Sequence, residues 1–407
     1  MVFPESLNSI LGLYLNKLNK AIARSTLILV LIHDSSLLGP NTFTGHNYTS
    51  NLRKVANPMA KTILVTGSSG LVGRSCTERF LNEGYVVYGI DNNGRALYFG
   101  IAACTRKLNE SHLSNQKMLT ELDIDITNRL SVQELVQRIK PYAIIHTAAQ
   151  PSHDKAAQIP FLDFETNAVG TLNLIESLRM VNIDGIFVHL STNKVYGDSP
   201  NLLPLVELET RFDFADEHSI KGINESQSID SSMHSLFGVS KLSADIWVQE
   251  YGRYFGIRTC VLRGGCLTGS NHKGVPLHGF LSWLVKCNLT GLDYSILGHK
   301  GKQVRDNLHA DDVADFALHF VEKPNVASIY NLGGGFANSV SILEAVKLVE
   351  EASGIRMRTN YNNLARTGDH IVYYSDLTKI QSDYPSWKVT WGLDSILEDL
   401  VKHQNDN

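Results

Sequence analysis

The chain has 407 residues, and its content of 43% hydrophobic and 19% charged residues is typical of a globular protein with a sizeable core. A formal net charge of −4 supplies no broad basic surface, which argues against a nucleic-acid partner. The closest approach to a membrane segment, residues 27–32, is far shorter than the roughly 20 residues that span a bilayer, so we expect no membrane partner.

Five cysteines are scattered along the chain, without a CxxC pair and without a histidine at metal-ligand spacing. This pattern predicts reduced thiols in a soluble, cytoplasmic protein and no metal site. The five are Cys76, Cys104, Cys260, Cys266 and Cys287.

From residue 61 onward, short apolar runs alternate with longer amphipathic segments. Residues 63–66, 74–83 and 86–91 predict a strand, a helix and a second strand, which together form a βαβ unit. Further strands are predicted at 143–146, 185–190 and 258–262, and the longest helices at 171–180 and 240–254. This alternation predicts an α/β fold with a Rossmann-type, doubly wound parallel sheet, whose ligands lie at the carboxyl ends of the strands.

The alternation loosens after about residue 265, which predicts a boundary there. We expect a Rossmann domain at residues 59–265, with 199–232 contributing to the substrate side, and a smaller, mainly substrate-binding lobe at 266–407. Residues 1–58 carry few acidic residues and a basic start before a short apolar run, but no clear cleavage site of a targeting peptide. They predict a poorly ordered, non-catalytic extension.

A glycine-rich turn follows the first predicted strand. Gly67, Gly70 and Gly73 have the spacing GxxGxxG, and glycine lets the backbone approach a pyrophosphate at the N-terminus of a helix. Asp91 ends the next strand, where its carboxylate can accept hydrogen bonds from a ribose 2′-hydroxyl and would repel a 2′-phosphate. The two features together predict NAD rather than NADP as the cofactor.

This glycine spacing is the form found in short-chain dehydrogenases/reductases, and later segments resemble the extended members of that family. Asp125-Ile126 matches the adenine contact, Ala148-Ala149-Gln150 the loop beneath the cofactor, and Asn167 the asparagine of the following helix. The resemblance implies cofactor binding by Gly67, Ser69, Gly70, Leu71, Val72, Gly73, Asp91, Asn92, Asp125, Ile126, Ala148, Ala149, Gln150, Asn167 and Lys241.

Residues 191–198, with the sequence STNKVYGD, resemble the segment that carries the catalytic Ser or Thr in the nucleotide-sugar enzymes of this family. The match implies that Thr192 is catalytic. Related 4,6-dehydratases have an Asp-Glu pair after that residue, whereas Asn193 and Lys194 stand here, so dehydration lacks its acid. The segment instead resembles the CDP-paratose 2-epimerases, as do residues 207–211, 301–306 and 330–334. The similarity covers roughly residues 61–395.

One departure concerns the family motif YxxxK, where this chain has Phe237 and Lys241. In the family the tyrosine takes the proton of a hydroxyl as hydride leaves the same carbon, and Phe237 cannot do so. Three interpretations stay open: His234, one helical turn earlier, is the base; Thr192 and a water relay the proton; or the protein binds its ligands with little or no turnover.

The substrate implied by the resemblance is a nucleotide-diphosphate sugar, bound by Asn193, His278, Arg305, Arg366 and Asp369; for His278 the only basis is its position. Guanidinium groups suit phosphate because their donors are planar and forked. We expect an NAD-dependent epimerase that oxidises a ring carbon transiently, C2 by the resemblance, and returns the hydride to its opposite face. Alternatives are a nucleotide-sugar dehydrogenase or reductase, or a weakly active binding protein. The family commonly forms homodimers or higher homo-oligomers.

Overall fold

The computed structural model describes residues 61–106, 116–216, 219–276, 278–366 and 368–404. The extension predicted at residues 1–58 lies outside these described residues. Residues 59–407 form one compact unit, and the fold below is that of this unit.

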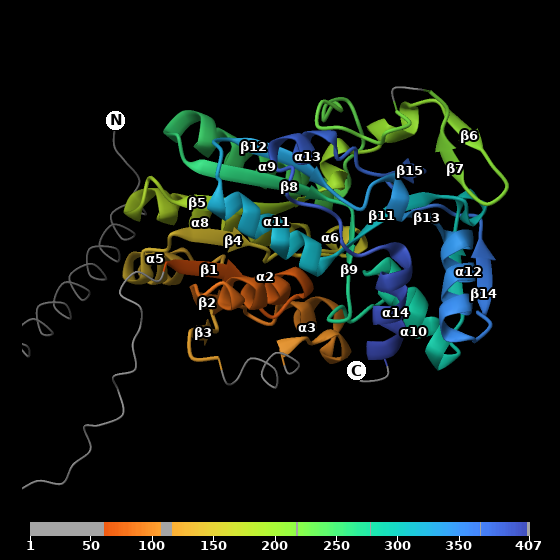
Figure 1. The fold of residues 1–407 in the computed structure, drawn as a ribbon, viewed down its shortest axis with the longest axis horizontal. Coiled ribbons are helices and arrows are strands. Elements are labelled where there is room, and N and C mark those ends of the chain that lie inside the picture. The colour runs from red at the N-terminus through yellow and green to blue at the C-terminus, as the bar shows by residue number, and fades with distance from the viewer. Residues whose placement is uncertain (1–60, 107–115, 217–218, 277, 367, 405–407) are drawn as a thin grey trace, which may run out of the picture. The chain divides into compact units, whose positions relative to one another are not determined.

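A seven-stranded sheet with only parallel neighbours forms the centre of the fold (Figure 1). Its order is β12-β8-β5-β4-β1-β2-β3. The bounds are β1 Thr62–Thr66, β2 Val86–Ile90, β3 Leu119–Leu122, β4 Ala143–His146, β5 Ile186–Thr192, β8 Arg258–Gly264 and β12 Ser328–Leu332. The strand order reverses between β1 and β4, which is where ligands of doubly wound sheets bind. The predicted fold class is confirmed.

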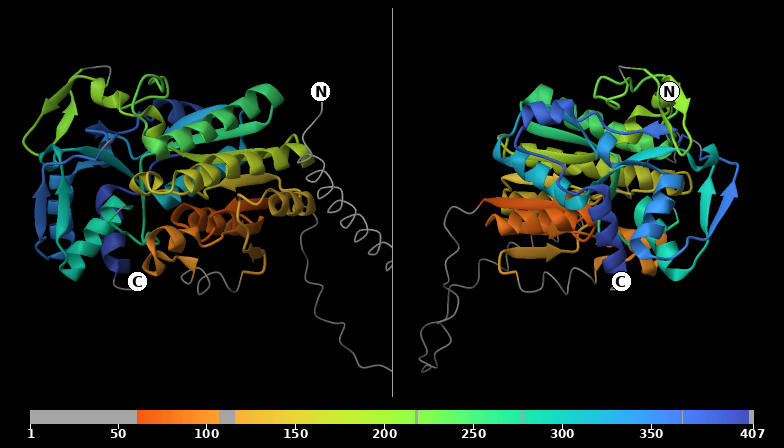
Figure 2. Two further views of the ribbon diagram at one scale, coloured as in Figure 1. Left: turned by 180° about the vertical axis from the view of Figure 1, so that it is seen from behind. Right: turned by 45° about the vertical axis from the view of Figure 1, so that its right-hand side comes forward.

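Helices cover both faces of this sheet. On one face α2 (Leu71–Asn82) packs against α11 (Ala310–Glu322), and on the other α5 (Arg129–Ile139), α8 (Gly170–Val181) and α9 (Ser235–Phe255) lie side by side (Figures 1 and 2). The inner strands are therefore buried on both sides. Ile63, Leu64 and Val65 of β1 are fully buried, and burying each such side chain stabilises the fold by roughly 1.5–3 kcal/mol.

The second part of the unit is a smaller lobe. Helices α10 (Phe280–Thr290), α12 (Ile342–Ser353) and α14 (Leu393–Gln404) pack around Leu284, Val349 and Leu397. Strand β10 (Tyr294–Leu297) pairs with β14 (Thr359–Asn362), and β11 (Val304–His309) pairs with β9 (Cys266–Thr268), β13 (Ser339–Ser341) and β15 (Val372–Tyr373). Strands β6 (Leu205–Glu207) and β7 (Phe212–Phe214) form a separate antiparallel pair.

The boundary predicted near residue 265 does not separate the two parts in space. Strand β12 pairs with β8, and α11 packs on α2, so residues 310–332 return to the central sheet. The sequence pattern missed this because β12 follows the lobe strands β9, β10 and β11 in the chain. The helix predicted from residue 240 begins at Ser235, and the strand predicted to end at residue 190 continues to Thr192.

Three further features of the described residues concern membrane spans, metal sites and disulfides. Among the described residues no helix is both long and apolar enough to cross a membrane, and no group of three His, Cys, Asp or Glu side chains could hold a metal ion. All five cysteines are free thiols, and burial raises the pKa of Cys76 to about 12.

Candidate active site

A cavity of about 780 Å³ opens at the carboxyl ends of β1, β2, β4 and β5 and continues into the lobe. This volume is in the usual range for small-molecule and cofactor sites. Most residues predicted for the site line it. They are Gly67, Gly70, Leu71, Val72, Gly73, Asp91, Asn92, Ile126, Ala148, Ala149, Thr192, Asn193, Phe237, Lys241, His278, Arg305, Arg366 and Asp369.

The glycine turn connects β1 to the N-terminus of α2 at one end of the cavity. Gly67 has φ +67°, and a Cβ on Gly73 would lie 2.0 Å from the carbonyl oxygen of Gly67, so the turn closes only with glycine at these positions. No side chain caps the N-terminus of the 12-residue helix α2, whose N-cap is Gly70. The free N–H groups and the helix dipole there suit a pyrophosphate.

Asp91 stands at the end of β2 and is held by backbone donors. Its carboxylate accepts hydrogen bonds from the N–H groups of Ser69 (3.1 Å) and Asn93 (2.7 Å), and burial raises its pKa above the ordinary value. Ser69 thus braces Asp91 and does not line the cavity. Asp125 likewise accepts a 2.9 Å hydrogen bond from the side chain of Asn92, which does line it.

Gln150 and Asn167 lie behind the cavity wall. The Asn167 side chain accepts from the N–H of Gln150 (2.9 Å) and donates to the carbonyl of Gln150 (3.1 Å) and to Ser240 Oγ (3.0 Å). Asn167 belongs to a π-helical turn, Glu165–Val169, between α7 (Pro160–Phe164) and α8. The pair fixes the loop whose residues Ala148 and Ala149 line the cavity, and neither side chain of the pair reaches it.

Arg95 is a cavity residue that the sequence interpretation missed. It lies in α3 (Gly94–Phe99), donates to the carbonyl of Lys273 (2.5 Å) and approaches His278 Nδ1 at 3.3 Å. His278 Nδ1 also lies 3.1 Å from His272 Nε2, and burial, with the Arg95 charge, lowers the pKa of His278 to about 3. His278 is therefore neutral, and with Arg95 it closes the cavity near Asp91. No sequence motif marks Arg95, although it follows Asp91 by four residues.

Thr192, Phe237 and Lys241 all line the cavity. β5 extends beyond β4, because His146 pairs with His189 and β5 continues to Thr192. The Thr192 hydroxyl accepts from the N–H of Lys194 (3.2 Å). Lys241 donates to the carbonyl of Leu190 (2.5 Å), and burial lowers its pKa to about 8.

His234 does not line the cavity. Its Nε2 lies 2.8 Å from the carbonyl oxygen of Ile229, and its Nδ1 lies 3.4 Å from that of Lys194. A ring held between two carbonyls, outside the cavity, is poorly placed to take a proton from a substrate. This placement argues against the hypothesis that His234 is the base.

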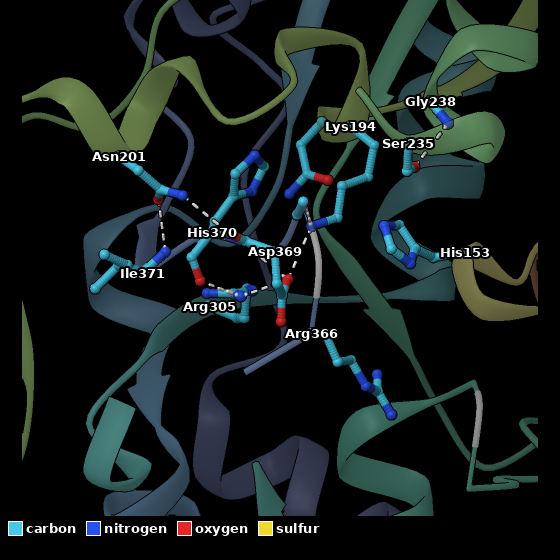
Figure 3. A network of polar contacts seen from close by, with 12 residues as sticks. His153, Lys194, Asn201, Ser235, Gly238, Arg305, Arg366, Asp369, His370 and Ile371 are labelled. Carbon is cyan, nitrogen blue, oxygen red and sulfur yellow. Dashed lines mark hydrogen bonds and ion pairs between the residues drawn. The ribbon is translucent and has the colours of Figure 1, made fainter. Parts of the chain in front are cut away.

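At the lobe end, three charged side chains form a connected wall (Figure 3). Lys194 Nζ lies 2.8 Å and the Arg305 guanidinium 2.7 Å from Asp369 Oδ1, and Arg305 also donates to the carbonyls of Val304 and His370. Burial by itself would raise the pKa of Asp369, but the charges of Arg305 and Lys194 hold that pKa well below the ordinary value.

Arg366 is less engaged than Arg305, although the sequence predicted the same phosphate-binding role for both. Its guanidinium lies 3.6 Å from Asp154 and donates to the carbonyl of Pro276 at 3.2 Å, and its side chain is 38% exposed. Arg366 therefore keeps donors for an incoming anion, whereas the donors of Arg305 already bind protein groups.

Comparisons with known proteins agree with this geometry. Residues 63–333 match the model of the NAD dependent epimerase/dehydratase family. The CDP-paratose 2-epimerase of Salmonella typhi is 34% identical over 328 residues, 78% of this chain and 92% of that protein. Human UDP-glucose 4-epimerase is 28% identical over 368 residues, 86% of this chain and 98% of that protein. The structure of Thermus thermophilus UDP-glucose 4-epimerase with NAD shares the fold, with a TM-score of 0.67 and 23% identity, covering 84% of this chain and 99% of that one.

Proposed function

The chain belongs to the NAD dependent epimerase/dehydratase family, and from that premise we propose that it inverts a ring carbon of a nucleotide-diphosphate sugar. The observation that carries the proposal is one continuous cavity that joins the glycine turn and Asp91 to Thr192, Lys241 and Arg366. The similarity to CDP-paratose 2-epimerase favours a CDP-sugar and inversion at C2.

The described residues fit NAD. The uncapped N-terminus of α2 suits the pyrophosphate, and Asp91 suits a ribose that carries a free 2′-hydroxyl. When bound, NAD supplies a reversible hydride acceptor, which inversion needs because the C–H bonds of a sugar alcohol are too weakly acidic for a protein base. Lys241 holds a positive charge beside the nicotinamide ribose.

The remaining residues act on the sugar nucleotide. Thr192 donates a hydrogen bond to the reacting oxygen, and Arg366 binds the diphosphate through its forked donors. Lys194 is paired with Asp369, and Asn193 cannot release a proton, so no acid stands next to Thr192 to protonate a leaving hydroxyl. This arrangement favours epimerisation over dehydration.

The test is to incubate the purified protein in deuterium oxide with CDP-, UDP-, GDP- and dTDP-sugars and to follow the ring protons by NMR. A new epimer without deuterium at the inverted carbon supports the proposal, because returned hydride does not exchange with solvent. Deuterium at that carbon would instead indicate proton abstraction, and stoichiometric NADH would indicate a dehydrogenase.

A second function is favoured by Phe237, which removes the family's proton acceptor. A protein that binds NAD and a sugar nucleotide with little turnover would give no product in the same assay. In that case Phe237→Tyr should create or restore turnover.

A further inference from the structure

The catalytic region has no obvious proton acceptor, since Phe237 stands where the family has tyrosine and His234 lies outside the cavity. Resting on the proposed function, we propose that Nε2 of His153 accepts and returns the proton of the reacting sugar hydroxyl. His153 opens the short helix α6 (His153–Ala156), directly after the loop beneath the cofactor, and lines the cavity.

The free nitrogen of His153 faces the catalytic helix. A Cβ built on Gly368 would lie 3.5 Å from His153 Nε2 and 3.7 Å from Ser235 Cβ, so both residues flank the same glycine. Ser235 begins α9, which carries Phe237 and Lys241. Figure 3 shows the His153 ring pointing toward the space between Lys194, Ser235 and Asp369.

The hydrogen bonds of His153 leave Nε2 available as an acceptor. Nδ1 lies 3.4 Å from Asp154 Oδ1. This contact is the main cause of the lowered pKa of Asp154, and the Arg366 charge lowers it further, while burial acts in the opposite direction. Nε2 is buried and makes no hydrogen bond to any residue that the structure describes. A carboxylate that orients Nδ1–H leaves the lone pair of Nε2 for a substrate hydroxyl, the arrangement of a general base.

One lysine and two other histidines of the cavity are already engaged by protein groups. Lys194 binds Asp369 and the carbonyl of Gly368. His272 and His278 bond to each other beside Arg95. Among the cavity residues described, His153 thus combines an oriented imidazole with a free nitrogen close to α9.

In the proposed step, the proton and the hydride leave the sugar toward different acceptors. The O–H bond of the sugar hydroxyl breaks and its proton moves to Nε2 of His153. The carbon becomes a carbonyl as its hydrogen leaves with two electrons as hydride, which NAD accepts. After the sugar reorients, hydride returns to the opposite face of the carbonyl and Nε2 returns the proton to oxygen.

The matched experiment compares His153→Gln with His319→Gln in the NAD-loaded protein. His319 Nδ1 lies 3.4 Å from Asp315 on α11, a similar His–Asp pair outside the cavity. We expect kcat of His153→Gln to fall at least 100-fold, the usual contribution of a general base, with CDP affinity within threefold of wild type. His319→Gln should retain wild-type kcat. Adding Phe237→Tyr to His153→Gln should raise kcat at least tenfold above that of His153→Gln, which a merely structural role of His153 would not allow.

The pH profile adds a second readout. The acidic limb of kcat/KM in the wild type should be absent in His153→Gln, because a protonated imidazole cannot accept the hydroxyl proton. The charged groups beside the pair of His153 and Asp154 are Arg366 and Asp369, which both act on Asp154, and Lys194, which is paired with Asp369. Unchanged kcat and an unchanged acidic limb in His153→Gln would overturn the proposal.

Nitrogen NMR separates this proposal from the proposed function. Adding CDP-glucose to the NAD-loaded wild type should shift the Nε2 resonance of His153, assigned by its absence in His153→Gln, and leave that of His319 unmoved. If no sugar is converted, the proposed function fails. If CDP-glucose also leaves the Nε2 resonance unmoved, the role of His153 is overturned as well. A shift without conversion would place His153 at the sugar but reject proton transfer.

Discussion

The two ends of the cavity are built in different ways. The cofactor end consists of a tight turn, the start of α2 and Asp91, all within 30 residues of the chain. The sugar end joins Lys194, Arg305 and Asp369, which come from three distant segments, and both cations share the one carboxylate. The cofactor end therefore depends on local backbone geometry, while the sugar end depends on the packing of the lobe against the sheet.

The largest expected effect lies where the two ends meet. Lys241→Met should lower kcat by roughly 10²–10⁴-fold, since a positioned charge beside the reacting groups is lost. Because burial lowers the pKa of Lys241 to about 8, its ammonium is lost as pH rises through about 8, and wild-type turnover should fall over that range. A pH–rate profile checks this, with the exposed Lys347→Met as the control. Equal turnover in both variants would contradict the role of Lys241.

The next largest effect concerns the contribution of Asp91 to NAD binding at the cofactor end. Asp91→Asn should weaken NAD binding roughly tenfold or more, because hydrogen bonds to a charged acceptor contribute about 1.5–3 kcal/mol, and it should improve binding of NADP. Calorimetric titration with both dinucleotides measures the ratio. Asp125→Asn, which weakens the contacts to Asn92 and Thr127 behind the cavity lining, should have a smaller effect. An unchanged preference for NAD in Asp91→Asn would show that Asp91 does not meet the ribose.

A smaller effect tests the charged wall at the sugar end. Asp369→Asn leaves Lys194 and Arg305 without their shared carboxylate, which should lower the free energy of unfolding by about 1–2 kcal/mol, less than for a fully buried pair because Asp369 is partly exposed. The pKa of Asp369 is lowered in the folded state, so its contribution is present above about pH 4 and is lost as pH falls below that value.

Urea denaturation at pH 7 and pH 3 checks both parts of this prediction. The difference between wild type and Asp369→Asn should shrink at the lower pH. Glu207→Gln, which removes an exposed partner of Lys300 and Lys302, should leave the unfolding midpoint unchanged. Equal stability of wild type and Asp369→Asn at pH 7 would mean that the wall does not hold the lobe together.

The smallest effect concerns the closure over the cofactor end. Arg95→Gln breaks the contacts to Lys273 and His278 that join α3 to the lobe segment. We expect the release rate of NAD to rise by less than tenfold, with kcat close to wild type, because no reacting group is touched. Stopped-flow displacement of NADH measures this rate. A slower release would contradict the closure.

The difference between the two ends also explains what the sequence could predict. The family, the α/β fold and NAD were predicted correctly, because the glycine turn, Asp91 and the strand–helix alternation are short-range patterns. The return of β12 to the sheet was missed, because lobe strands intervene in the chain. Sequence spacing also placed His234 one turn before Phe237, but α9 begins only at Ser235, whose φ is +62°, so His234 precedes the helix and its Nε2 lies against the carbonyl of Ile229.

The roles of the remaining site residues depend on tertiary contacts, which the sequence does not show. No spacing indicates that Arg305 would bind Asp369 and two carbonyls, that Gln150 would bind Asn167, or that His153 would keep a free nitrogen. The contacts of Arg305 with Asp369 and His370 and of Gln150 with Asn167 join residues at least 17 positions apart, and the free nitrogen of His153 reflects the absence of a partner among the described residues. Such properties arise only when the lobe, the loop beneath the cofactor and α9 come together.

The central claim is that a dinucleotide spans the switch point of the sheet with its nicotinamide ring beside Thr192 and Lys241. A crystal structure with NAD and CDP tests it most directly. We expect the pyrophosphate at the start of α2, the adenine ribose on Asp91 and the nicotinamide ring next to Thr192. NAD bound elsewhere, or no affinity for either redox form in a folded preparation, would contradict it.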